Sequence, residues 1–189
     1  KDKLGGLNEY GLASYKTTNN FAQSEIRWLL SIGGIEVKTS QKLGRDFTLS
    51  DLQRDYDAVF LGMGLAGVNA LGISEPDVNG IREAVDFIAE LRQADDKAEV
   101  AIGRQVIVIG GGDTGCDCIA TATRHKAASV VNFELLPRPP KSRAKDNPWP
   151  EFPRVFKVDY GHAEVQANWH RDPREYAIMS TGFVSDGHG

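Results

Sequence analysis

The chain has 189 residues, of which 41% are hydrophobic, and a net charge of −4. This composition excludes wholesale disorder, and the acidic balance argues against nucleic-acid or anionic-membrane partners for the chain as a whole. No apolar run approaches the ~20 residues of a membrane span, and the N-terminal residues do not form a signal peptide pattern. The two cysteines are too few for a disulfide framework, so we expect a cytoplasmic protein. Because the chain begins at Lys1 rather than Met, we also expect a fragment.

The first half of the chain predicts alternating helices and strands. Helical spacing of apolar residues and a plausible cap at Ser50 indicate three helices, and two runs of β-forming residues indicate strands. The expected helices cover 21–32, 48–56 and 80–93, and the expected strands cover 35–39 ("IEVKT") and 57–64 ("DAVFLGMG").

From Arg104 onward the pattern is β-α-β. The run 105–109 ("QVIVI") is typical of a strand buried on both faces of a parallel sheet. A helix over 113–126, a strand over 129–135, a proline-rich loop, a short helix over 161–169 and a strand over 174–184 follow it. This alternation predicts an α/β fold with a Rossmann-like parallel sheet.

The turn after the first of these strands has the spacing Gly110-x-Gly112-x-x-Gly115, which matches the dinucleotide fingerprint. The first glycine permits the tight turn, the second lets the backbone approach a pyrophosphate, and the third lets the helix pack close to the strand. The helix N-terminus then offers N–H groups to phosphates. The turn also contains Gly111, Asp113 and Thr114. Asp113 and Thr114 either serve only as helix-start residues or face the cofactor as well. The alternative is a glycine turn that binds nothing.

Glu134 lies nineteen positions after Gly115, at the end of the second strand, where an acidic residue would bond the ribose hydroxyls of NAD. Arg138 follows closely, with Lys141 and Arg143, and these cations suit the extra phosphate of NADP. The choice between NAD and NADP therefore stays open. In the alternative interpretation Glu134 is a surface carboxylate and the basic residues belong to a solvated loop.

Several motifs together carry a family resemblance. The segments "VIVIGGGDTGCDC", "NFELLPRPP", "NPWPEFP", "VDYGH" and "RDPREY" resemble the small (beta) subunit of glutamate synthase. The segments "GGLNEYG", "SIGGIEVKT", "LGRDFTL" and "YDAVFLGMG" resemble the same flavoprotein superfamily, closest to the amino-terminal reductase region of dihydropyrimidine dehydrogenase. The resemblance covers nearly the whole chain. The family usually has alanine where this chain has Gly115, a change that the turn should tolerate.

The resemblance implies two interleaved Rossmann-like domains. Residues 1–67 would be a partial FAD-binding segment, and residues 68–189 a C-terminally incomplete NAD(P)-binding domain. The flavin would lie along Gly5, Gly6 and Leu7, and the FAD phosphates would lie near Gly62 and Gly64. The implied reaction is hydride transfer from NAD(P)H to FAD, which needs no acid or base side chain, so no catalytic residue is expected.

The electrons would then pass through iron–sulfur clusters, which the resemblance places outside this chain, to a glutamate synthase large subunit or an equivalent acceptor. There glutamine and 2-oxoglutarate become glutamate. Cys116 and Cys118 point to different faces of the predicted helix, so we expect buried core residues rather than metal ligands.

Two alternatives remain from the sequence. The chain could be a non-catalytic dinucleotide-binding module, because its FAD site is only partly present. It could also belong to a reductase that delivers electrons to a pyrimidine. In each case we expect a broken FAD domain to expose apolar surface, which would favour self-association of this chain.

Overall fold

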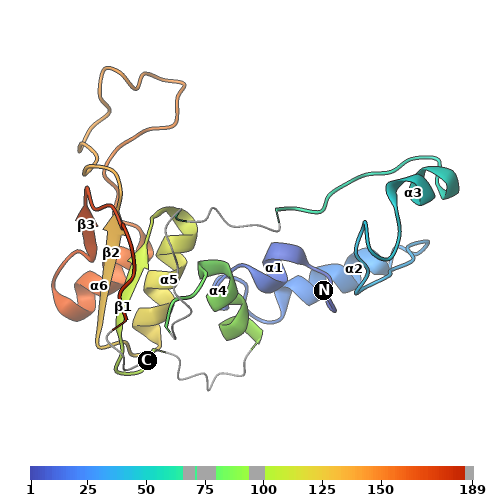
Figure 1. Ribbon diagram of the computed structural model, residues 1–189, viewed down its shortest axis with the longest axis horizontal. Coiled ribbons are helices and arrows are strands. Elements are labelled where there is room, and N and C mark those ends of the chain that lie inside the picture. Colours follow the sequence, from blue (N-terminus) through green and yellow to red (C-terminus); the bar gives the residue numbers. More distant parts are fainter. Residues whose placement is uncertain (66–70, 72–79, 94–100, 186–189) are drawn as a thin grey trace.

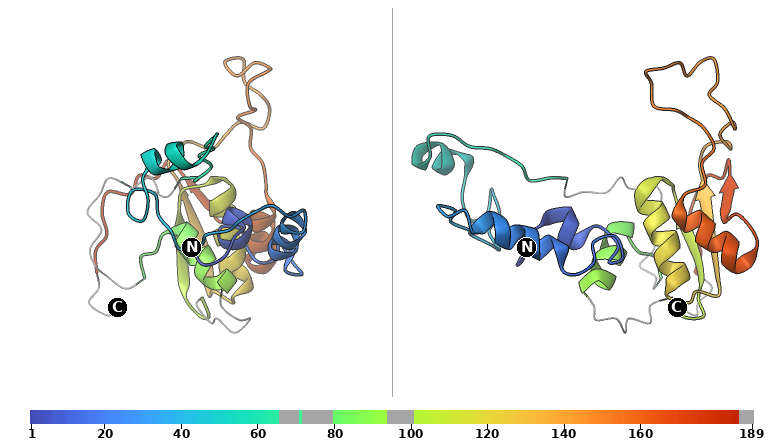
Figure 2. Two further views of the ribbon diagram at one scale, coloured as in Figure 1. Left: turned by 90° about the vertical axis from the view of Figure 1, so that its right-hand side faces the viewer. Right: turned by 180° about the vertical axis from the view of Figure 1, so that it is seen from behind.

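The computed structural model describes residues 1–65, 71, 80–93 and 101–185. Its carboxyl-terminal half holds three parallel strands in the order β1-β2-β3, joined by two helical crossovers (Figure 1). The helices α5 and α6 lie side by side on one face of this sheet, as the rear view in Figure 2 shows. The elements are β1 (Gln105–Ile109), α5 (Gly112–Arg124), β2 (Ser129–Glu134), α6 (Tyr160–Trp169) and β3 (Arg174–Tyr176). The predicted Rossmann-like α/β fold is therefore confirmed. The expectation that residues 105–109 are buried on both faces is wrong among the described residues, because Val106 and Val108 pack on the core whereas Ile107 is 58% exposed.

The core of this half lies between α5 and the sheet. Ile119 from α5, Val130 from β2 and Val165 from α6 are completely or almost completely buried, with three alanines around them. The two helices approach closely at Gly161, where a Cβ atom would lie 2.6 Å from the main-chain oxygen of Cys116. Only glycine leaves room for this approach, because a real Cβ atom does not sit that near a backbone oxygen.

The amino-terminal half is helical, with α1 (Gly6–Tyr10), α2 (Phe21–Leu30) and α3 (Leu49–Asp55). Helix α4 (Ala84–Gln93) packs against both α1 and α5 and so joins the two halves (Figure 1). The cap of α3 is Thr48 rather than Ser50, although the helix itself lies within the expected range 48–56. Thr48 Oγ1 accepts from Asp51 N at 3.2 Å and Asp51 Oδ2 accepts from Thr48 N at 3.0 Å. This reciprocal capping box satisfies two end donors, whereas Ser50 already lies inside the helix.

Two predicted strands are wrong. Residues 35–39 and 57–64 form no strand, so the expected glycine-ended strand at Gly62 and Gly64 is absent from the structure. A strand needs a neighbouring backbone to satisfy its N–H and C=O groups, and neither run has one among the described residues. The apolar side chains of the second run are accordingly exposed, with Phe60 at 94%.

The last predicted strand is much shorter than expected. The sequence indicates 174–184, but β3 ends at Tyr176. Ala177 has a φ of 57°, a left-handed conformation that no strand continues through. The next two amides still bond the end of β2 and the chain just after it, since Ala177 N donates to Leu136 O at 3.1 Å and Ile178 N to Glu134 O at 3.0 Å.

The helices predicted over 21–32, 80–93 and 161–169 are confirmed within a few residues at each end. The expected boundary between the two domains, at residues 67–68, lies outside the described residues. Among the described residues, no helix combines the length and apolar character needed to cross a bilayer.

Candidate dinucleotide-binding site

The glycine turn joins β1 to α5 at the carboxyl end of the sheet. Gly110 has a φ of 93° and Gly112 a φ of 77°, both in the region that side chains with a Cβ rarely adopt. Gly110 N donates to Phe133 O at 2.9 Å, which keeps the start of the turn paired to β2. The backbone of the turn therefore requires glycine at these two positions of the fingerprint.

The third fingerprint glycine serves the close packing that the sequence predicts. A Cβ atom at Gly115 would lie 2.8 Å from Gly110 O and 4.0 Å from a methyl of Val108. Helix α5 thus rests directly on the turn, and the alanine that the family usually carries here would need a small backbone shift in this chain.

A buried asparagine on β2, which the sequence analysis did not single out, holds the turn from below. Asn132 is completely buried, and its Nδ2 donates to Val108 O at 3.0 Å and to Gly110 O at 2.8 Å. The sequence feature that could have pointed to this residue is a single polar side chain between the apolar residues of "SVVNFE". Its amide bonds both the end of β1 and the first residue of the turn, so it holds the turn's conformation.

The N-terminus of α5 has no side-chain cap. Its N-cap residue is Gly111, which has no side chain to accept from the first turn. Helices α3 and α6 by contrast both begin with a capping box. Asp113 and Thr114 lie exposed in the first turn of the helix. The free N–H groups and the positive end of the helix dipole suit an anionic ligand such as a pyrophosphate.

The carboxylate of Glu134 lies directly over this turn. A Cβ atom at Gly111 would lie only 2.7 Å from Glu134 Oε2. Burial raises the pKa of Glu134, and the nearby positive charge of Arg174 partly opposes this rise. The side chain is half-buried and faces the turn, which favours the ribose-binding interpretation over a solvated surface carboxylate. It also faces a pocket of about 310 Å³ that contains Gly112 and Asp113.

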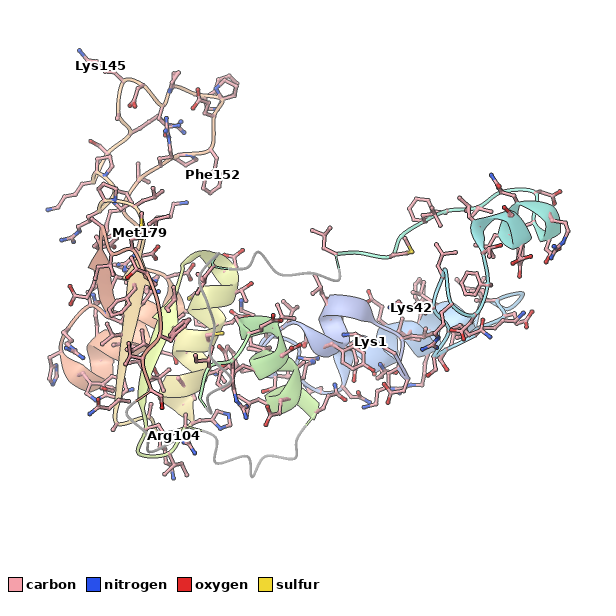
Figure 3. All side chains as sticks on the ribbon, viewed as in Figure 1. Lys1, Lys42, Arg104, Lys145, Phe152 and Met179 are labelled. Carbon is pink, nitrogen blue, oxygen red and sulfur yellow. The ribbon has the colours of Figure 1, made fainter. Side chains whose placement is uncertain are left out.

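The wall of this pocket opposite the turn comes from the proline-rich arm, residues 137–158, and from β3. The arm projects from the body, with Lys145 and Phe152 on its outer part (Figure 3). Arg138 lies at the base of the arm, where its guanidinium carbon is 4.3 Å from the centre of the Phe156 ring. Arg174 lies 4.6 Å from the same ring and is paired with Asp172 at 2.6 Å. Phe156 and Arg174 line the pocket.

The residues expected near the flavin lie elsewhere. Gly5 and Gly6 have φ values of 114° and 52° where α1 begins, and the side chain of Leu7 is 69% exposed. Helix α4 lies between α1 and α5, so these residues do not join the glycine turn (Figure 1). Gly62 and Gly64 lie on the extended run that follows α3, and Gly64 has a φ of 67°.

The two cysteines of α5 are buried and unbonded to each other. Burial raises the pKa of both thiols, to about 12 for Cys118. Among the described residues no cluster of three or more His, Cys, Asp or Glu side chains could hold a metal ion.

The protein therefore belongs to the Rossmann-like class of nucleotide-binding folds, because it combines a parallel sheet, a glycine turn and a helix without a side-chain cap. A family model described as pyridine nucleotide-disulphide oxidoreductase matches residues 5–150. The chain belongs to this family of oxidoreductases.

Three of the proteins similar to this chain are glutamate synthases. The chain is 43% identical over 198 residues to a glutamate synthase [NADH] of Saccharomyces cerevisiae and 44% identical over 197 residues to that of Schizosaccharomyces pombe. It is 40% identical over 195 residues to the glutamate synthase [NADPH] small chain of Bacillus subtilis. All three alignments cover 100% of this chain, which spans 9% of each yeast protein and 39% of the bacterial one.

Proposed function

We propose that this chain is the pyridine-nucleotide-binding part of an NAD(P)H-dependent flavin oxidoreductase of the glutamate synthase kind. Residues 68–189 would form the nucleotide domain, and residues 1–67 would belong to the FAD domain. When bound, the two cofactors supply hydride transfer from the nicotinamide to the flavin. The electrons would reach a glutamate synthase large subunit, or an equivalent region of the same polypeptide, through iron–sulfur clusters outside this chain.

The observation that carries the proposal is the uncapped N-terminus of α5 beneath the glycine turn. The turn leaves free N–H donors, and the bare backbone of Gly112 lines a pocket large enough for part of a dinucleotide. Asn132 keeps the turn in this form by binding Gly110 O. Gly110, Gly111, Gly112 and Gly115 would thus receive the pyrophosphate, with Asp113 and Thr114 at its edge.

We further propose that NADH is the preferred nucleotide. The Glu134 carboxylate beside Gly111 suits the two hydroxyls of the adenosine ribose and would repel a 2′-phosphate. Arg138 packs on Phe156, and Arg143 donates to Asn147 O and Glu151 O within the arm. Both guanidiniums would have to leave these contacts to bind a 2′-phosphate.

In this scheme the protein places groups and provides no proton. The turn orients the pyrophosphate, Glu134 fixes the ribose, and the pocket wall of Phe156 and Tyr176 keeps water from the nucleotide. On the flavin side, Gly5 and Gly6 would let the backbone lie close to the ring system with Leu7, while Gly62 and Gly64 would approach the FAD phosphates.

The test is calorimetric titration of this chain with NADH and with NADPH, repeated on Gly112→Val. Gly112 has a positive φ and no neighbouring atom within 4 Å of a Cβ, so valine strains and covers the turn itself. We expect NADH to bind at least tenfold more tightly than NADPH, and valine to abolish binding of both. Binding of neither nucleotide to the wild type would contradict the proposal.

Flavin content separates the enzyme from a non-catalytic module. A preparation that retains or takes up FAD supports the enzyme, whereas a colourless protein that binds NADH supports the module. The named relatives favour glutamate synthesis over the pyrimidine-reducing alternative, because all three are glutamate synthases.

A further inference from the structure

A buried carboxylate in α5 takes no part in the proposed dinucleotide site. Asp117 follows Gly112 by five residues, and its side chain is only 3% exposed. A buried charge is strongly unfavourable unless it is paired and hydrogen-bonded. The partners of Asp117 therefore indicate what this carboxylate does.

These partners come from two other segments of the chain. Lys16, which follows α1, forms an ion pair with Asp117 Oδ1, and Tyr160, the first residue of α6, donates its hydroxyl to the same oxygen. The Tyr15 hydroxyl lies 3.3 Å from the Tyr160 hydroxyl and 3.3 Å from the main-chain oxygen of Asp117. The guanidinium of Arg124, also on α5, stacks 3.7 Å from the centre of the Tyr15 ring.

Lys16 provides the positive charge that pairs with the Asp117 carboxylate. Burial lowers the pKa of Lys16, but its hydrogen bond and charge pairing with Asp117 outweigh this effect and raise the pKa above its ordinary value. Burial and the Asp117 carboxylate also raise the pKa of Tyr160. One cation and one neutral phenol therefore donate to one buried anion. Such a buried ion pair adds little stability compared with apolar packing, but it holds its two side chains in one relative position.

The segment that Lys16 belongs to is also anchored at its other end. Arg92 of α4 donates to Glu9 O at 2.6 Å and to Leu12 O at 3.0 Å, at the carboxyl end of α1. These contacts hold both ends of the segment, and Leu7 lies just ahead of the first. The segment from Glu9 to Lys16 thus connects the residues proposed for the flavin to the helix proposed for the pyrophosphate.

We propose that the cluster of Lys16, Asp117 and Tyr160 is a latch that fixes Gly5–Leu7 relative to the N-terminus of α5. This inference rests on the proposed function, because it makes Lys16 and Asp117 positioning residues for the approach of the nicotinamide to the flavin. Small errors in such an approach slow a transfer reaction greatly, so an ion pair with a single geometry is useful even where it adds little stability.

The experiment compares wild type with Lys16→Met, which keeps the aliphatic stem and removes the charge. Hydrogen–deuterium exchange would follow the amides of residues 8–16, and calorimetry would give the Kd for NADH. We expect exchange in this segment to rise at least tenfold while the Kd for NADH changes less than twofold. Lys16→Arg should restore slow exchange. In FAD-loaded protein, the rate of flavin reduction by NADH should fall at least tenfold in Lys16→Met.

The matched control is Lys38→Met, which removes an exposed lysine that lies 3.2 Å from Glu36, outside this segment. We expect it to leave exchange and flavin reduction unchanged. Unchanged exchange in Lys16→Met, or an equal rise in exchange in Lys38→Met, would overturn the latch. A parallel weakening of NADH binding would overturn the positioning role. If wild type binds no NADH, the proposed function fails, but the exchange data still decide whether the latch exists.

Discussion

Two apolar segments with similar sequence patterns adopt different structures in this protein. Residues 105–109 form β1, which pairs with β2 along its whole length. Residues 57–64 also predict a strand, yet they form none, and Phe60 and Met63 are 94% and 68% exposed. The pattern alone therefore does not make a strand, because the ladder must come from a neighbouring backbone.

The same contrast holds for the two halves as wholes. Between the sheet and its two helices, Ile119, Val130 and Val165 are buried, whereas in the amino-terminal half Trp28 and Ile32 remain 66% and 70% exposed. Such surface supports the expectation that this chain self-associates, which stays a prediction. A clean monomer in light scattering at high concentration would contradict it.

We expect the largest effect on stability from a substitution at Gly161, where α5 and α6 pack most closely. Gly161→Val places a Cβ within 2.6 Å of Cys116 O, so α6 must move away from α5. We expect a loss of about 3 kcal/mol in the free energy of unfolding and a Tm lower by roughly 10 °C, measured by thermal denaturation. Gly182→Ala is the control, because its Cβ meets nothing within 4 Å and should leave the Tm unchanged.

The next effect tests how β2 supports the glycine turn. Asn132→Ala removes two hydrogen bonds and leaves Gly110 O without its side-chain donor. We expect a loss of about 2 kcal/mol in the free energy of unfolding, together with weaker NADH binding, measured by urea denaturation and calorimetry. Asn132→Asp keeps the shape but cannot donate when ionised. If Asn132→Asp left the protein as stable as wild type, this role of the amide would be disproved.

A smaller effect is expected where α4 attaches the amino-terminal half. Arg92→Met retains the aliphatic stem but loses the donors to Glu9 O and Leu12 O. We expect faster amide exchange in α1 and a loss of about 1.5 kcal/mol in stability. Arg82→Met, which breaks an exposed ion pair with Glu90 near the same helix, should cost less than about 0.5 kcal/mol. Equal effects of the two variants would argue against the attachment.

The smallest effect concerns the pH dependence of nucleotide binding. Because burial raises the pKa of Glu134, its carboxylate protonates at a higher pH than an ordinary glutamate does. Affinity for NAD⁺, if it depends on the ionised form, should therefore be full near neutral pH and fall as the pH decreases through the raised pKa. Calorimetry across this range should show a decrease of about tenfold. Glu134→Gln should bind weakly at every pH, and a pH profile like that of wild type would refute the assignment.

The Rossmann-like half and its fingerprint could be predicted from the sequence alone. Strand 105–109, the glycine spacing and Glu134 are all local or periodic features, so they can be recognised without knowing what packs where. The placement of Glu134 over Gly111 follows from the parallel register of β1 and β2, which the alternation already implied.

Only the tertiary structure decided which residues support that fingerprint. Asn132 looks like an isolated polar residue until β2 lies beside the turn, and Asp117 looks like any helical carboxylate until Lys16 and Tyr160 meet it. These contacts join residues 22 to 101 positions apart in the chain, and no local pattern encodes them. The unpaired run 57–64 has the same cause, since a strand depends on a partner that its own residues do not specify.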